Sequence, residues 1–293
     1  MARHAHATAP TRRLVILAVA LAAFAALACG GDTATPVTPN AIAVSASATP
    51  SIPTPAPVTG ELIVSAASSL TEVFTDTARA FEARYPGVKV TLNFASSAAL
   101  ATQINEAAPG DVFASADKVQ MDVVKVERKA APGAVFALNR LVIAKPKGST
   151  AVATYADLAK SGLKLVLAAD GVPVGNYSLQ SLAAADKSAA FGAGFQAKVM
   201  ANVKSREANV RTALTKVQLG EADAAIVYST HIASAPEVEA VSIPDAYNVT
   251  AEYFIAPLTA GRNATAGTAF VAFVRSIEGQ AFLTKRGFTV PPR

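Results

Sequence analysis

Strand and helix signals alternate along the chain from about residue 61 to residue 293, and this alternation limits the fold more than any other feature. Residues 62–64 are typical of a buried strand, and the apolar residues that follow, up to Phe81, fall at helical spacing until a Pro-Gly pair at 86–87. Residues 88–94 then alternate between apolar and polar, as a half-buried strand does. This order predicts an α/β fold with mainly parallel strands.

The same order of signals continues to the end of the chain. Further strands are expected at residues 111–114, 141–144, 165–168, 224–228 and 253–255, and helices from Ser97, from about Tyr177, around Val210 and from Phe270 to Leu283. About 230 residues are enough for two modest lobes. No segment of distinct composition interrupts them to mark a lobe boundary.

The first 28 residues have the pattern of an export signal. Arg12 and Arg13 precede an unbroken apolar run of 15 residues, from Leu14 to Ala28. A membrane-spanning helix is the alternative, but it needs about 20 apolar residues. We therefore expect residues 1–28 to be a signal peptide.

Cys29 follows this run directly and is the only cysteine, so neither an intrachain disulfide nor a metal site built on cysteine is possible. The preceding residues 26–28 resemble the lipobox of bacterial lipoproteins, although that motif prefers Leu at the place of Ala26. The resemblance implies lipidation at Cys29 and an extracytoplasmic, membrane-anchored protein. The alternative is a cleaved secretory peptide with an incidental cysteine.

Residues 29–60 consist mainly of Thr, Pro, Ala, Ser and Val. Such a segment cannot bury a core, and its prolines keep it extended. We expect a disordered tether that holds the folded body away from a membrane.

Several functions are excluded by what the sequence lacks. Loss of residues 1–28 removes three arginines and no acidic residue, so the formal charge falls from +5 to +2. The positive charge that would have indicated a nucleic-acid partner therefore belongs largely to the targeting segment. There is no phosphate loop of the Walker type and no Gly-x-Ser-x-Gly motif. The segment from Gly192 to Ala197 fits a loose dinucleotide pattern but follows a helical segment, so we expect a turn between helices.

His231 is the sole histidine after residue 28, and we expect it at the surface or at a helix start. With so few bases available, nucleophilic catalysis is not expected. We predict no catalytic residue, no cofactor and no bound metal cation. Asp111 and Asp117 are expected to be structural, although a carboxylate-dependent exported hydrolase, using residues such as Asp111 or Asp170, remains an alternative.

Serines follow two consecutive predicted strands. Ser69 and Glu72 have the spacing of a capping box, and Ser96 and Ser97 stand at the start of the next helix. A serine at such a place usually only caps its helix. However, helix starts offer free N–H groups and a positive dipole end, and ligands bind at the carboxyl ends of parallel strands. The two serine pairs therefore favour an anion site.

Residues 61–293 resemble the periplasmic molybdate-binding protein family, the receptors of molybdate ABC transporters. The segments that carry the resemblance are residues 66–71, 94–104, 108–117, 172–177, 209–214, 226–228 and 286–288, in the order of the family. It implies a two-lobe periplasmic-binding-protein fold of type II, with crossing strands as the hinge. Lobe I would comprise residues 61–136 and 247–293, and lobe II residues 137–246.

The resemblance also implies the site. Its residues would be Ser69 and Ser97, each through a hydroxyl and a backbone N–H, Val174 and Val210 through backbone N–H groups, and Tyr228 through its phenol. Val174 stands where the family often has alanine, which a backbone donor tolerates. Ser68 is a further candidate contact, and Arg211 is expected to face outward.

The implied ligand is molybdate or tungstate, held by neutral donors between the lobes. The implied partner is an ABC permease with a separate ATPase, and the receptor is expected to be a monomer. Alternatives are a receptor for another tetrahedral oxyanion, such as sulfate or thiosulfate, and an adhesive surface lipoprotein.

Overall fold

The computed structural model describes residues 57–129, 131–259 and 261–292. The predicted signal peptide, Cys29 and most of the predicted tether lie outside these residues. Among the helices that are described, none combines the length and the apolar character that a membrane span requires.

In the part of the chain that the structure describes, nine strands form one sheet, and the strands expected from the sequence are present. They are β1 (Gly60–Ala67), β2 (Val88–Ala95), β3 (Val112–Ser115), β4 (Ala134–Pro146), β5 (Leu165–Ala168), β6 (Val203–Glu207), β7 (Ala224–Tyr228), β8 (Val238–Ser242) and β9 (Thr250–Pro257). The α-helices are α1 (Thr71–Arg84), α2 (Ser97–Asn105), α3 (Lys118–Val123), α4 (Pro173–Asp186), α5 (Phe195–Ala201), α6 (Val210–Gln218), α7 (Ala264–Arg275) and α8 (Ile277–Lys285). Short 3-10 helices include η1 (Ser68–Leu70) and η4 (Ser229–Ser234).

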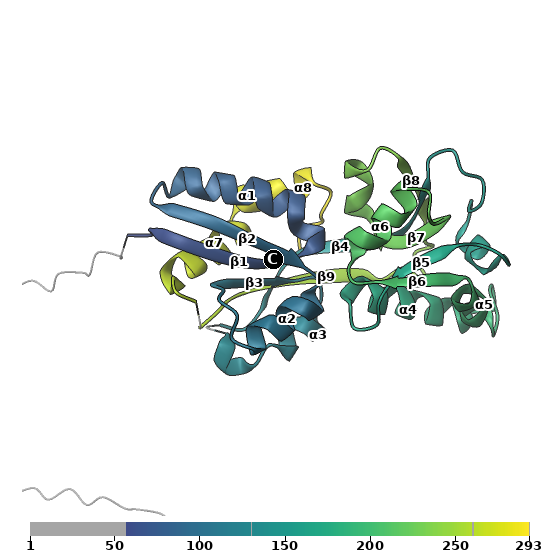
Figure 1. The fold of residues 1–293 in the computed structure, drawn as a ribbon, viewed down its shortest axis with the longest axis horizontal. Helices are drawn as coiled ribbons and strands as arrows, with labels where there is room; N and C mark the ends of the chain where they lie inside the picture. The colour runs from purple at the N-terminus through teal and green to yellow at the C-terminus, as the bar shows by residue number, and fades with distance from the viewer. Residues whose placement is uncertain (1–56, 130, 260, 293) are drawn as a thin grey trace, which may run out of the picture. The chain divides into compact units, whose positions relative to one another are not determined.

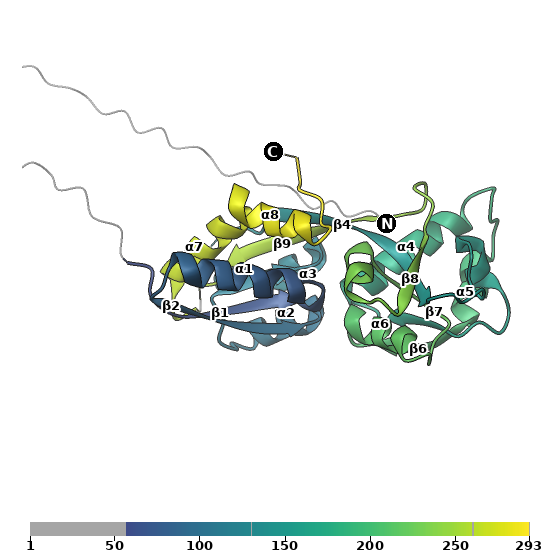
Figure 2. The ribbon, with the colours of Figure 1, turned by 90° about the horizontal axis from the view of Figure 1, so that it is seen from above.

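The strand order is β2-β1-β3-β9-β4-β7-β5-β6, with β8 paired to β4. Strands β1, β2 and β3 pair in parallel, as do β5, β6 and β7. Every antiparallel pairing involves β4 or β9. Figures 1 and 2 show the resulting two lobes, with α1, α2, α3, α7 and α8 around one set of strands and α4, α5 and α6 around the other. The predicted two-lobe α/β fold is therefore confirmed.

Strand β4 carries the chain from one lobe to the other. Its residues 134–140 pair with β9, whereas residues 141–146 pair with β7 and β8. Its change of partner, between Arg140 and Leu141, lies a few residues beyond the lobe boundary predicted at 136/137. The boundaries themselves stay a prediction.

Each lobe has an apolar core that follows the helical periodicity of the sequence. In α1, Phe74 and Phe81 are buried and pack edge-on against Phe270 of α7, with ring centroids 5.9 and 5.2 Å apart. In α6, Leu214 and Val217 are buried in the same way. Each such side chain contributes about 1.5–3 kcal/mol to folding. This packing holds α1 and α6 in place, and with them the first residues of both helices.

Two helices differ from the prediction. The single helix expected from Phe270 to Leu283 is two helices, because Ser276 adopts an extended conformation and caps α8 by accepting the N–H of Gly279. Helix α4 begins at Pro173 rather than near Tyr177, since a proline lacks an N–H and fits the first helical position. Gly192 and Gly194 lie in the turn between α4 and α5, as predicted.

Candidate functional site

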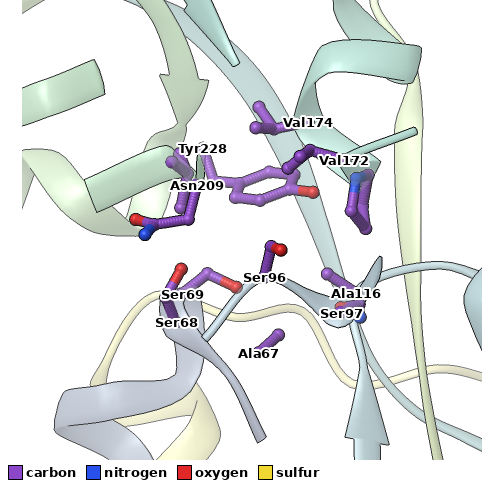
Figure 3. A pocket seen from close by; sticks show the side chains of 12 residues that line it. Ala67, Ser68, Ser69, Ser96, Ser97, Ala116, Val172, Val174, Asn209 and Tyr228 are labelled. Carbon is purple, nitrogen blue, oxygen red and sulfur yellow. Dashed lines mark hydrogen bonds between the residues drawn. The ribbon is translucent and has the colours of Figure 1, made fainter. Parts of the chain in front are cut away.

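A small pocket lies where the starts of several helices meet (Figure 3). Its lining residues are Ala67, Ser68, Ser69, Ser96, Ser97, Ala116, Val172, Pro173, Val174, Asn209, Val210 and Tyr228. The structure thus brings together all five predicted donors and the additional candidate Ser68. The cavity volume is only about 10 Å³, whereas pockets for drug-sized ligands occupy about 300–1,000 Å³, so this narrow pocket favours a ligand of few atoms.

The serines form one wall, at the ends of β1 and β2. Ser69 Oγ accepts a hydrogen bond from Tyr253 Oη at 3.0 Å, and Ser97 Oγ accepts one from the Ala116 N–H at 2.9 Å. A hydroxyl that accepts from the protein still has its own hydrogen to donate. Both serines can therefore act as donors toward the pocket.

Ser69 is not the helix cap that its spacing with Glu72 predicted. The residue before α1 is Leu70, which makes no side-chain cap, and Ser69 belongs to η1. Glu72 instead pairs with Arg211, with 2.7 Å between Oε1 and Nη1. The capping prediction is correct for Ser96, whose Oγ accepts the N–H of Ala99 at 3.3 Å.

The starts of α4 and α6 form the opposite wall. Val174 is the second residue of α4 and Val210 the first of α6, and N–H groups in the first turn have no acceptor within their own helix. Asn209 Oδ1 accepts the N–H groups of Arg211 and Thr212, and the N–H of Val210 remains available. Gly175 allows α4 to start close to β5, since a Cβ there would lie 2.4 Å from the carbonyl oxygen of Ala169.

Tyr228, at the end of β7, is 1% exposed and lines the same pocket. Within residues 57–129, 131–259 and 261–292, its hydroxyl has no hydrogen-bond partner. Burial raises its pKa well above the usual value, and Tyr253 adds to this shift, so the phenol keeps its proton. An unpaired buried hydroxyl costs about 1–3 kcal/mol, and this donor therefore indicates a missing acceptor.

Of the described residues that line the pocket, none has a charged side chain. Arg211 is half exposed and pairs with Glu72 of the other lobe, in agreement with the expectation that it faces away from the ligand. Figure 3 shows the serine side chains facing Val174, Asn209 and Tyr228 across a space into which the phenol points. The arrangement is one of neutral donors.

The acidic residues considered for catalysis do not line the pocket. Asp111 is buried and accepts the N–H groups of Ile63 and Asn263, both at 2.7 Å. Asp117 caps α3 through the N–H of Gln120, and Asp170 pairs with Arg206 at 3.0 Å. No group of three or more potential metal ligands occurs in the part of the chain that the structure describes.

His231, expected at the surface or at a helix start, is the third residue of the short helix η4, but it does not lie at the surface. Its exposed fraction is 3%, and neither ring nitrogen has a hydrogen-bond partner among the described residues. Burial and the nearby charge of Arg211 lower its pKa to about 4. A single histidine among small residues carries no periodic signal, so its burial could not be inferred from the sequence.

Two polar residues of the pocket were missing from the predicted set. Ser96 and Asn209 each precede a helix, and both have the cap signature that the sequence offers at such places. Their side-chain oxygens accept backbone N–H groups, which fixes the two helix starts. Ser96 also faces the pocket with its hydroxyl.

Comparison with known proteins agrees with this geometry. Residues 62–289 match the family described as bacterial extracellular solute-binding protein. The molybdate-binding protein ModA of Mycobacterium tuberculosis is 36% identical over 233 residues, which cover 78% of this chain and 85% of the relative.

Two solved structures share the fold at lower identity. The periplasmic molybdate-binding protein of Azotobacter vinelandii has a TM-score of 0.68 and 20% identity, with 79% of this chain and 100% of that protein covered. The sulfate-binding protein SubI of M. tuberculosis has a TM-score of 0.70 and 18% identity, with 78% and 86% covered. The chain belongs to the bacterial extracellular solute-binding proteins and, within them, to the family of the molybdate-binding protein ModA.

Proposed function

We propose that this protein is the solute receptor of an ABC importer and binds molybdate or tungstate in the pocket between Ser69, Ser97, Val174, Val210 and Tyr228. The observation that carries the proposal is the buried, unpartnered hydroxyl of Tyr228 in a pocket lined by neutral donors. The relatives named as molybdate-binding proteins support the choice of ligand.

The chemistry of the pocket suits a tetrahedral dianion. Such an ion has no proton and only accepts hydrogen bonds, so it requires donors on every side and no carboxylate nearby. Each bond to a charged acceptor contributes about 1.5–3 kcal/mol, and the starts of α2, α4 and α6 add favourable dipoles. A cationic side chain is then unnecessary.

The same chemistry separates the competing ions. Phosphate near neutral pH carries a proton, which a pocket of donors leaves unpaired at a cost of about 1–3 kcal/mol. Sulfate has the right charge but shorter bonds, and it would stretch the hydrogen bonds of a cavity sized for molybdate. Tungstate is nearly the size of molybdate, so both are expected to bind.

Delivery would follow from closure of the lobes on the ligand. Only a closed form makes contacts from both lobes, and the permease can then distinguish a loaded receptor from an empty one. In this proposal lobe I is formed by residues 61–136 and 247–293 and lobe II by residues 137–246. A lipid on Cys29 and the segment 29–60 would hold a monomeric receptor at the membrane.

Isothermal titration of the protein with molybdate tests the proposal, followed by tungstate and by sulfate and phosphate as competitors. We expect one molybdate per chain and displacement by tungstate but not by millimolar phosphate. Absence of binding to any oxyanion would contradict the proposal. Tighter binding of sulfate would favour the second candidate, a sulfate receptor, which the likeness to SubI supports.

A further inference from the structure

Tyr253 lies on the connecting strand β9 and contacts one predicted donor from each lobe. Its side chain is fully buried, and its hydroxyl donates to Ser69 Oγ at 3.0 Å. Its ring also packs against that of Tyr228, with centroids 5.7 Å apart and planes at 61°. Tyr253 does not line the pocket itself.

The direction of the bond from Tyr253 to Ser69 decides what Ser69 can offer a ligand. A serine hydroxyl has one hydrogen and two lone pairs. The geometry of the bond makes the Tyr253 hydroxyl the donor, and because burial raises the pKa of Tyr253 above its usual value, the phenol keeps the hydrogen that it donates. Because Tyr253 occupies a lone pair of Ser69, the serine hydrogen is left for the pocket, and each bond of such a chain strengthens the next.

We propose that Tyr253 is a positioning residue that determines specificity: by donating to Ser69 Oγ, it fixes Ser69 as a donor and makes the pocket prefer oxyanions that carry no proton. This inference rests on the proposed function and deepens it. Without the Tyr253 hydroxyl, Ser69 can rotate and present a lone pair, which a protonated oxyanion can use and a bare dianion cannot.

The substitution Tyr253→Phe removes only this hydroxyl and keeps the ring that packs against Phe136, Tyr228 and Phe288. By isothermal titration we expect the affinities for molybdate and for sulfate each to fall about fivefold, the effect of one net hydrogen bond. The affinity for phosphate, measured by competition at phosphate concentrations well above the millimolar range, should not fall. The ratio of molybdate to phosphate affinity would therefore decrease about fivefold, and the ratio of molybdate to sulfate would not change.

The chain offers a matched control. Tyr155 is also buried, and its hydroxyl bonds a serine, Ser181, at 2.8 Å, but neither residue lines the pocket. Tyr155→Phe removes a buried tyrosine–serine bond of the same kind. It should lower the thermal stability as Tyr253→Phe does and leave all three oxyanion affinities unchanged.

A double-mutant cycle with Ser69→Ala separates positioning from general destabilisation. In the Ser69→Ala background, Tyr253→Phe should cause no further loss of molybdate affinity, because the residue through which it acts is gone. Additive losses would overturn the inference, as would an equal decrease for all three ions in Tyr253→Phe. An unchanged ratio of molybdate to phosphate in Ser69→Ala alone would overturn it too, even if Tyr253→Phe failed to fold.

The two proposals fail in different ways. If the unmodified protein binds no oxyanion, the proposed function is wrong. If it binds molybdate and Tyr253→Phe keeps the same preference over phosphate, only the role of Tyr253 is wrong.

Discussion

Two neighbouring cavities share Ser69 and differ in the way they could treat an anion. The first is the pocket of neutral donors, of about 10 Å³. The second, of about 100 Å³, is lined by Ser69, Glu72, Val73, Thr230, His231, Ala233, Ser234, Lys285, Arg286 and Phe288. The second cavity is lined by the cationic side chains of Lys285 and Arg286. The first is lined by neutral hydrogen-bond donors, which a dianion without a proton requires.

The charges around the second cavity are largely matched by opposite charges. Arg286 bonds Asp76, with 2.9 Å between Nε and Oδ2, and Glu72 pairs with Arg211. A dianion placed there would meet the carboxylate of Glu72 as well as the cations. We therefore expect neutral groups with free hydrogens to select a proton-free anion better than a mixture of charges does.

The largest effect should come from bringing a negative charge into the neutral pocket. Ser97→Asp keeps an acceptor for the Ala116 N–H and places an acid at a helix start, where it is tolerated. Repulsion of a dianion at about 4 Å should weaken molybdate binding by at least about 1,000-fold in isothermal titration. Thr102→Asp, on the exposed side of the same helix, should change the affinity by less than about threefold. Equal effects of the two substitutions would place the ligand elsewhere.

The substitution Tyr228→Phe should separate binding from stability. Loss of a charge-assisted hydrogen bond should weaken molybdate binding about 10- to 100-fold. The unliganded protein should melt at the same or a higher temperature, since the substitution removes a buried hydroxyl that has no partner among the described residues. A clear loss of thermal stability without ligand would show that the hydroxyl has a structural partner.

In the second cavity, His231 should make stability depend on pH. Its pKa of about 4 in the folded protein lies below about 6.5 in the unfolded chain, so unfolding takes up a proton between these values. The stabilisation by neutral His231 is complete above about pH 6.5 and decreases as the pH falls, by about 2 kcal/mol at pH 5. Denaturant unfolding of the protein and of His231→Leu at pH 7 and pH 5 measures this, and the same pH dependence in both would contradict it.

The smallest effect should come from Glu72→Gln, which breaks the ion pair with Arg211 beside both cavities. Because both side chains are partly exposed, water and salt screen the freed charge of Arg211. Molybdate affinity should rise by less than about threefold at low salt and return to the original value at 0.5 M NaCl. A loss of more than tenfold would show that Arg211 and Glu72 belong to the binding site.

The local parts of this structure could be predicted from the sequence. Strands β1, β5 and β7 follow from short apolar runs, strand β2 from alternation of apolar and polar residues, and the start of α2 from the serine signal at Ser96 and Ser97. These signals depend on neighbours in the chain, which the sequence shows directly. The predicted donors meet in one pocket because they stand where strands end or helices begin.

Contacts between distant segments could not be predicted in the same way. Ser69 and Tyr253 are 184 positions apart, and nothing in either segment indicates the other. The burial of His231 and the pairing of Glu72 with Arg211 likewise depend on how the lobes pack. The break at Ser276 had a local signal, a serine before Ile277, but the apolar periodicity on both sides concealed it.

The central claim is tested most directly by a crystal structure of the protein with tungstate, located by its anomalous scattering. We predict one anion within hydrogen-bond distance of the hydroxyls of Ser69, Ser97 and Tyr228 and of the N–H groups of Val174 and Val210. An anion found instead beside Lys285 and Arg286, in the charged cavity, would contradict the account.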